Sequence, residues 1–361
     1  MRVVIVGASG NIGTSVTEAL AAEPAVTSVL GLARRVPEWS PEKTEWAAVD
    51  IGGDIRRDTG ADPATEQLTA HFRGADAVVH LGWLFQPTHD ELITWRNNVL
   101  GGIRVFEAAA AANVPALLYS SSVGAYSPGP KDRAVGEDWP TDGWPTAAYT
   151  REKAYLERVL DRVEREHPDM RVVRMRPGFV FKQEAATEQR RLFAGPLVPQ
   201  QLVRPELIPL LPSIPGLRFQ AVHSLDVADA FRRAVLQPVR GAFNIAADPV
   251  VDADELGRML KARPVPVPAP AVRAVVAAAW RLHLVPASPQ LFEAVLHLPI
   301  MDTRRAREEL GWQPRHSADE ALSEFFEGLR DVSGMNTPPL SPETSGPARS
   351  HEFGTGIGST P

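Results

Sequence analysis

Tyr149 and Lys153 are the residues of this chain best suited to proton transfer, and their separation of four places both side chains on one face of a helix. A tyrosine hydroxyl ordinarily has a pKa of about 10, and a neighbouring ammonium lowers the cost of forming the phenolate. Tyr149 could therefore exchange protons near neutral pH. The same spacing also arises by chance on solvated helices, so this interpretation depends on the rest of the chain.

A serine cluster, Ser120 to Ser122, stands at the end of a strand predicted for Ala116–Tyr119. Open α/β sheets bind their ligands beyond the carboxyl ends of their strands. A hydroxyl at this position can polarise a substrate carbonyl and support the tyrosine.

Three glycines lie between a predicted strand, Arg2–Val6, and a predicted helix, Ile12–Ala22. Gly7 permits a tight turn, Gly10 lets the backbone approach a pyrophosphate, and Gly13 allows the helix to pack closely on the strand. The helix N-terminus then supplies amide donors for a phosphate. We therefore expect this loop to bind a dinucleotide.

The end of the second predicted strand bears on which dinucleotide is used. An NAD site usually has an acidic residue there, whereas Arg34 and Arg35 follow this strand and favour NADP over NAD. The alternative interpretation is that the two arginines belong to a solvated surface loop. Asp50, at the end of the third strand, could accept a hydrogen bond from the adenine amino group, although it could equally cap a turn, and Asp54 competes for the role.

The elements needed to position these groups follow an alternating pattern of short β-branched runs and longer helical segments. This alternation predicts an α/β fold with a Rossmann-type, doubly wound parallel sheet. We expect residues 1–178 and 219–247 to form the nucleotide-binding domain. Residues 179–218 and 248–331 should form a smaller, mainly helical substrate lobe, and residues 332–361 a disordered tail, because few large apolar groups occur there.

The composition excludes several classes of function. The 361 residues carry 38 Lys and Arg against 44 Asp and Glu, a formal charge of −6, which disfavours nucleic acid as a partner. The absence of cysteine removes thiol nucleophiles and Cys-ligated metals and fits a cytoplasmic location. The apolar N-terminal run is too short for a signal peptide. Prolines and charges interrupt Val265–Leu284, which predicts a buried or amphipathic helix and no membrane span.

Taken in order, these motifs resemble those of the extended short-chain dehydrogenase/reductases, the NAD-dependent epimerase/dehydratase group. The resemblance covers about residues 1–330. It rests on Gly7-x-x-Gly10-x-x-Gly13, Asp50-Ile51, His80-Leu81-Gly82, Asn97-Asn98-Val99, Ser120-Ser121-Ser122, Tyr149-x-x-x-Lys153, Arg176-Pro177-Gly178, His223 to Ala228, and Leu310-Gly311-Trp312.

The resemblance implies specific roles. Tyr149 would be the acid/base, Lys153 the ribose anchor and pKa partner, and Ser122 the ligand of the substrate carbonyl, with Ser121 as second choice. Asn98 would stabilise the site, and His80 is interpreted as a packed histidine. No metal ligand is predicted. The cofactor-binding candidates are Gly7, Ser9, Gly10, Asn11, Ile12, Gly13, Arg34, Arg35, Asp50, Ile51, Leu81, Gly82 and Lys153.

Three functions remain open at this point. The first is an NAD(P)-dependent oxidoreductase acting on a small, rather apolar metabolite, for which Trp83, Phe85, Trp144 and Phe181 could form the substrate mouth. The second is a nucleotide-sugar epimerase with tightly bound NAD, for which Arg190, Arg191, Arg204 and Arg218 could bind the anion. The third is a non-catalytic NADP-binding sensor, which would not need the Ser/Tyr/Lys set. The Thr-Asp-Glu sequence of sugar dehydratases is absent, which argues against 4,6-dehydration. The partner expected is a small molecule, with a homodimer left open.

Overall fold

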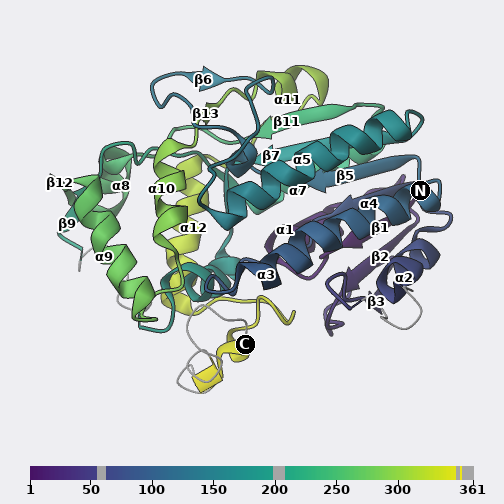
Figure 1. Ribbon diagram of the computed structural model, residues 1–361, viewed down its shortest axis with the longest axis horizontal. Helices are drawn as coiled ribbons and strands as arrows, with labels where there is room; N and C mark the ends of the chain where they lie inside the picture. The colour runs from purple at the N-terminus through teal and green to yellow at the C-terminus, as the bar shows by residue number, and fades with distance from the viewer. Residues whose placement is uncertain (55–61, 198–207, 347–349, 352–361) are drawn as a thin grey trace.

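A parallel sheet of seven strands forms the centre of the molecule (Figure 1). The computed structural model describes residues 1–54, 62–197, 208–346 and 350–351. Across the sheet the strands lie in the order β11 (Gly241–Ile245), β7 (Arg171–Pro177), β5 (Ala116–Ser120), β4 (Ala77–His80), β1 (Arg2–Val6), β2 (Ser28–Ala33) and β3 (Thr44–Ala48). All neighbouring pairs run parallel, which confirms the predicted fold class.

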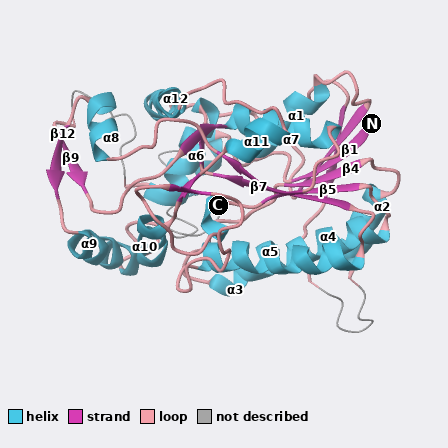
Figure 2. Ribbon diagram, turned by 90° about the horizontal axis from the view of Figure 1, so that it is seen from above, coloured by secondary structure: helices cyan, strands magenta, loops and turns pink. Residues whose placement is uncertain are grey.

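Helices cover both faces of this sheet, as Figure 2 shows. Helices α1 (Asn11–Ala21) and α7 (Ser224–Leu236) lie on one face, and α2 (Pro63–Phe72), α4 (Gly101–Ala111) and α5 (Ala148–Glu166) lie on the other. Strand β1 shows why both faces must be covered. Val3 and Ile5 belong to one apolar core, whereas Val4 and Val6 belong to the other. The sequence of a strand that is buried on both faces is a nearly continuous run of apolar residues, and the sequence of β1 is such a run.

The strand order reverses beside β1. The chain proceeds from β1 outward through β2 to β3, then crosses back to β4 on the other side of β1. The loops that leave β1 and β4 therefore diverge, and such a switch point opens a crevice at the carboxyl ends of the strands. The glycine loop after Val6 and the segment after His80 flank this crevice.

A smaller lobe lies beside the carboxyl ends of the central strands. Strand β8 (Phe179–Phe181) pairs with β10 (Ala221–His223), and β9 (Leu210–Ser213) pairs with β12 (Arg263–Pro266). The domain boundaries stated above remain a prediction. The other elements are α3 (Glu91–Thr94), η1 (Trp95–Leu100), η2 (Val123–Ala125), β6 (Ala134–Val135), η3 (Gln183–Ala185), α6 (Ala186–Gln189), η4 (Arg190–Ala194), α8 (Ala253–Leu260), α9 (Ala269–Arg281), α10 (Pro289–His297), β13 (Ile300–Met301), α11 (Arg304–Glu309), α12 (Ala318–Asp331) and η7 (Pro342–Ser345).

Helix α9 corresponds to the apolar stretch singled out in the sequence. It contains no fully buried residue, and Val275 is 69% exposed, so the expectation of a buried helix is wrong and only an amphipathic helix remains. In the part of the chain that the structure describes, no helix combines the length and apolar character needed to cross a membrane.

Residues 333–346, here called the C-terminal strap, correct the expectation of a disordered tail. Leu340 is fully buried, and the carbonyl of Ser333 accepts a hydrogen bond from Thr187 Oγ1 at 2.8 Å. Arg191 donates to the carbonyl of Pro339 at 2.5 Å. Polar composition suggested disorder, but one apolar side chain and several backbone carbonyls are enough to anchor the segment. Residues 347–349 and 352–361 of the expected tail lie outside the described residues.

Candidate active site

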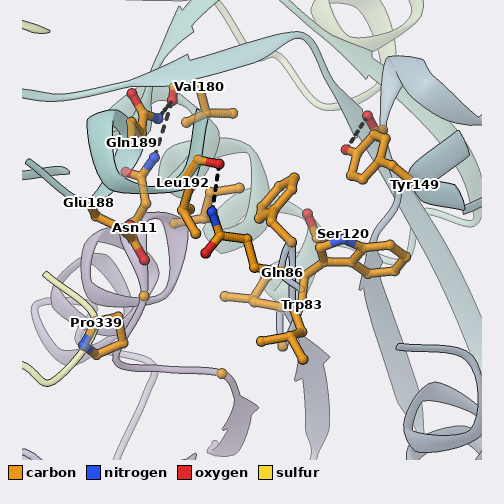
Figure 3. Close-up of a pocket in the computed structure, with 18 of the residues that line it drawn as sticks. Asn11, Trp83, Gln86, Ser120, Tyr149, Val180, Glu188, Gln189, Leu192 and Pro339 are labelled. Carbon is orange, nitrogen blue, oxygen red and sulfur yellow. Dashed lines mark hydrogen bonds between the residues drawn. The ribbon is translucent and has the colours of Figure 1, made fainter. Parts of the chain in front are cut away.

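One cavity of about 860 Å³ opens at the switch point of the sheet. Its volume is within the range of about 300–1,000 Å³ that is usual for small-molecule sites. The glycine loop and the ends of β2 and β4 form one end, and Ser122, Tyr149 and Lys153 lie further along it. Figure 3 shows side chains from widely separated parts of the sequence around this space.

The three glycines of the loop play different steric roles. Gly7 has a φ of +84°, and a Cβ atom on it would lie 2.4 Å from the nitrogen of Gly82. A Cβ atom on Gly13 would lie 2.2 Å from the carbonyl oxygen of Gly7, whereas one on Gly10 would have no neighbour closer than 3.8 Å. Gly7 and Gly13 are therefore required by the packing of the protein itself. Gly10 leaves open space, as expected if a ligand approaches the backbone there.

Helix α1 begins directly after Gly10, with no side-chain cap and no acidic residue in its first turn. The amides at this end therefore remain suited to an anion. Ser9, Asn11 and Ile12 also line the cavity. Asn11 Nδ2 donates to the carbonyl of Val180 at 3.1 Å, which ties the glycine loop to the small lobe (Figure 3). The loop fits the phosphates of a dinucleotide.

Only some of the residues predicted to bind the other end of the dinucleotide line the cavity. Arg34 and Arg35 line the cavity and are exposed. Ile51, Leu81 and Gly82 also line it. Asp50 is not among the lining residues, and its carboxylate accepts a hydrogen bond from the Gly52 amide at 3.0 Å. Asp50 thus has the turn-capping contact that was the alternative to adenine recognition.

Tyr149 and Ser122 form the central polar pair of the site. Tyr149 Oη donates to Ser122 Oγ at 2.8 Å. Tyr149 is in the first turn of α5, and Ser122 lies just beyond β5 at the start of η2. Gly124 makes the approach feasible, because a Cβ atom there would lie 2.6 Å from the Tyr149 ring. Ser121 instead donates to Glu157 at 2.6 Å, so the geometry favours Ser122 of the two candidates.

Lys153 lies one helical turn after Tyr149, and its ammonium donates to the carbonyl of Ser120 at 2.7 Å. The centre of the Trp83 ring is 3.5 Å from the same nitrogen, a cation–π contact. Burial lowers the pKa of Lys153 well below its ordinary value. Burial also raises the pKa of Tyr149 to about 12, against the downward shift expected from the neighbouring ammonium.

Two further residues, Asn98 and Glu152, support the site, and only Asn98 was expected to do so from the sequence. The side chain of Asn98 forms two hydrogen bonds with the backbone of Leu84: it accepts from the amide at 2.7 Å and donates to the carbonyl at 2.8 Å. The same Nδ2 of Asn98 donates to Glu152 at 2.7 Å, and Thr94 also donates to Glu152, at 2.6 Å. The stabilising role expected for Asn98 is thus given a structural basis. Glu152 was missed, although its position three residues after Tyr149 places it on the same side of the helix.

The remaining candidates are distributed unevenly. Trp83, Phe85 and Phe181 line the cavity, whereas Trp144 is not among its lining residues and stacks on His297 with ring centres 4.4 Å apart. His80 is 1% exposed, and burial lowers its pKa to about 3, in agreement with a packed histidine.

The four arginines proposed for anion binding are likewise separated. Arg190 and Arg191 line the cavity, whereas Arg218 donates to the carbonyl of Lys131 and is not among the lining residues. Arg204 lies outside the described residues.

Comparison with known proteins agrees with the fold. The model of the NAD dependent epimerase/dehydratase family matches residues 3–246. The uncharacterized protein Rv0501 of Mycobacterium tuberculosis is 26% identical over 330 residues, covering 90% of this chain and 83% of that protein. A UDP-glucose 4-epimerase of Yersinia pestis is 30% identical over 191 residues, which cover 49% of this chain and 52% of that enzyme.

Among solved structures, a Thermus thermophilus UDP-glucose 4-epimerase in complex with NAD superposes with a TM-score of 0.67. Its sequence is 20% identical, and the match covers 91% of this chain and 99% of that one. At this identity the likeness establishes the fold alone.

Proposed function

Because the chain belongs to the NAD dependent epimerase/dehydratase family, we propose that it is an NAD(P)-dependent oxidoreductase of the extended short-chain dehydrogenase/reductase type. Its reaction would transfer a hydride to or from the carbonyl or hydroxyl carbon of a small molecule. The observation that carries this proposal is the hydrogen bond of 2.8 Å between Tyr149 and Ser122 in the same cavity as the glycine loop.

Each residue of the site has a distinct task in this reaction. Gly10 and the amides at the start of α1 hold the phosphates, and Lys153 holds the ribose hydroxyls. The nicotinamide of the bound cofactor supplies or accepts the hydride. Ser122 orients the substrate oxygen, and Tyr149 gives that oxygen a proton when a carbonyl is reduced to an alcohol. Since the pKa of Tyr149 is raised to about 12, its hydroxyl retains that proton at neutral pH.

NADP is proposed as the preferred cofactor. Arg34 and Arg35 line the nucleotide end of the cavity, and neither forms an ion pair with any residue that the structure describes. Two exposed cations at the end of β2 suit the 2′-phosphate of NADP, since no acidic residue is present there to accept from a ribose 2′-hydroxyl.

Nucleotide-sugar epimerisation is the second candidate, because solved UDP-glucose 4-epimerases share this fold. Arg190 and Arg191 lie in the cavity as that function would need. Their guanidinium groups, however, donate to the carbonyls of Gly195 and Pro339. The third candidate, a non-catalytic sensor, receives no support from the close contact between Tyr149 and Ser122, since nucleotide binding alone does not require it.

The deciding experiment combines identification of the nucleotide with a turnover assay. Mass spectrometry of ligands released from the purified protein shows which dinucleotide is retained. Consumption of NADPH with a carbonyl substrate, abolished in Tyr149→Phe while nucleotide affinity is kept, supports an oxidoreductase. Interconversion of nucleotide sugars on tightly held NAD, without net NADPH consumption, would instead establish the epimerase.

We also propose that the protein forms a homodimer and is located in the cytoplasm. Leu100 in η1 is 43% exposed and Tyr155 in α5 is 45% exposed. Tyr155 also contacts Trp95 of η1, with ring centres 5.1 Å apart, so the two exposed side chains belong to adjoining elements and support a homodimer. The cysteine-free composition supports a reducing compartment such as the cytoplasm.

A further inference from the structure

The part of the cavity around Tyr149 has an unusually apolar wall. Three segments build it: the loop after β4, the turn η4, and helix α10 with the residues that flank it. Their apolar lining residues include Trp83, Phe85, Leu192, Phe193, Leu291 and Phe292.

Aromatic rings surround the tyrosine itself. The ring of Phe85 stacks on the Tyr149 ring with centres 5.3 Å apart and planes inclined by 16°. Trp83 meets Tyr149 edge-on at 5.6 Å, and Phe193 meets Phe85 edge-on at 5.4 Å. The ring that carries the reacting hydroxyl therefore packs against two other rings, in surroundings where an apolar group gains from being removed from water.

This wall is held in place by a buried amide. Gln86 is 1% exposed, and its Nε2 donates to the carbonyl of Leu192 at 2.8 Å and to that of Arg191 at 3.3 Å (Figure 3). The contact joins the loop that bears Phe85 to the turn that bears Phe193. Since Asn98 also clasps Leu84 on the other side, the aromatic positions are fixed before a substrate enters.

Three cations line the cavity near this wall, Lys153 beside Trp83 and Arg190 and Arg191 in η4. Arg34 and Arg35 belong to the nucleotide end of the cavity, and the lining residues of α10 include no cation in the described chain. Arg190 and Arg191 direct hydrogen bonds to backbone carbonyls of Gly195 and Pro339. Glu188 of α6, which also lines the cavity, is acidic, with a pKa that burial raises to about 7. A diphosphate packed against the lining side chains of α10 would lose hydration there without gaining hydrogen-bond donors from them.

We propose that this part of the cavity takes a neutral substrate with an apolar body, such as an aryl or alicyclic ketone or the corresponding secondary alcohol. The proposal rests on the proposed function. In reduction, the carbonyl carbon gains the hydride, its oxygen gains the Tyr149 proton, and the reduced nucleotide is oxidised. The apolar body of the substrate packs against Phe85, Phe193 and the side chains of α10.

A competition between two kinds of ligand tests the proposal. Calorimetry on the full chain saturated with NADP measures the affinities of acetophenone, cyclohexanone and UDP-glucose, and NADPH absorbance measures turnover of the two ketones. The expected result is that at least one ketone binds and is reduced, with an affinity about tenfold or more above that of UDP-glucose. Tighter binding of UDP-glucose, or no binding of either ketone, overturns the proposal.

This experiment distinguishes a wrong substrate class from a wrong reaction type. Hydride transfer to any substrate keeps the oxidoreductase assignment, even when UDP-glucose is the tighter ligand and the apolar substrate class is wrong. Sugar interconversion without hydride release contradicts the oxidoreductase itself. Nucleotide affinity, measured by the same calorimetry, confirms that each protein sample is folded and competent to bind.

A substitution in the apolar wall provides a second, independent test of the proposed substrate class. Phe193, at the rim, is 37% exposed, and Phe193→Arg places a cation where the apolar body is expected. We expect ketone affinity to fall about tenfold while NADP affinity is unchanged. The matched control is Leu197→Arg, because Leu197 is 52% exposed and is not among the lining residues. Equal losses in the two variants, or no loss in Phe193→Arg, would contradict the assignment.

Discussion

The ammonium of Lys153 lies 3.5 Å from the centre of the Trp83 ring, within the cavity that also contains Tyr149. The ring thus occupies one side of the cation that is proposed to hold ribose hydroxyls. A ligand that binds Lys153 must share it with Trp83 or displace the ring. Tryptophan emission is sensitive to such a change in a neighbouring charge, which makes this contact measurable.

Binding of NADP should therefore change the tryptophan fluorescence of the protein, and most of the change should come from Trp83. In Trp83→Phe the fluorescence response should largely disappear, while calorimetry still detects binding. Trp280→Phe is the matched control, since Trp280 stacks on His89 outside the cavity lining. A full response in Trp83→Phe would show that the ring does not report on the site.

The pH dependence of the reaction should follow the raised pKa of Tyr149, about 12. Below that pH the hydroxyl is protonated, so it is ready to donate in carbonyl reduction and must first ionise for alcohol oxidation. We expect the rate of oxidation to rise about tenfold per pH unit between pH 7 and 10, with reduction nearly flat. Steady-state rates in both directions provide the test. A plateau of oxidation near neutral pH would mean that the bound complex lowers this pKa after all.

Charge reversal at the end of β2 should separate the two nucleotides. Arg34→Glu combined with Arg35→Glu should weaken NADP at least about tenfold more than NAD, because only NADP carries the 2′-phosphate. Dissociation constants from calorimetry check this, and Arg281→Glu combined with Arg315→Glu, both away from the cavity lining, controls for the same change in net charge. Equal losses for both nucleotides, or a preference of the unaltered protein for NAD, would refute the NADP assignment.

Breaking the buried ion pair between Arg176 and Glu157 should strongly lower the free energy of unfolding. Arg176 forms a two-pronged contact with Glu157, at 2.9 Å and 3.1 Å, and Glu157 is fully buried. Arg176→Met leaves that carboxylate without its principal partner, so unfolding free energy should fall by about 3–5 kcal/mol. Arg176→Met combined with Glu157→Leu should cost less than the sum of these two single changes. Denaturant titrations measure all four proteins, and additivity would indicate that the pair is uncoupled.

Removal of the C-terminal strap should impair both stability and nucleotide binding. Ending the chain after Val332 deletes the buried Leu340 and the cavity-lining residues Pro338 and Pro339. Loss of Leu340 burial alone should lower the unfolding free energy by about 2–5 kcal/mol. A control that ends after His351 removes only residues outside the described chain. If both truncated proteins bind NADP and unfold like the intact protein, the strap contributes nothing to the site.

Local spacing was sufficient to predict the main features of the fold and part of the site. The turn at Gly7 and the helix that carries Tyr149 and Lys153 depend on neighbours within a few residues, and such relationships are visible in a sequence. The spacing of neighbouring residues does not decide between Ser121 and Ser122. It depends on Glu157, which is 36 residues from Ser121 and is itself held by Arg176.

Other features escaped because packing decides them. From the sequence, Asp50 could serve either a cofactor contact or a turn, and only the hydrogen bond that it accepts from the Gly52 amide shows that it caps the turn. The strap has a composition typical of disorder, yet carbonyls that any sequence possesses accept hydrogen bonds from Thr187 and Arg191. Burial likewise outweighs the hydrogen bond with Ser122 in setting the pKa of Tyr149, and burial depends on the complete tertiary structure.

The strap also joins distant parts of the chain. Asn336 donates to Glu38 at 3.2 Å although the two residues are 298 positions apart, and Pro339 lines the same cavity as Gly10. During translation the glycine loop therefore leaves the ribosome long before the last segment of its own cavity wall is made. A nascent chain can form β1 and α1 early, but the complete nucleotide site requires residues from both ends. A single proteolytic cut between α12 and Pro339 would release part of that wall without touching the sheet.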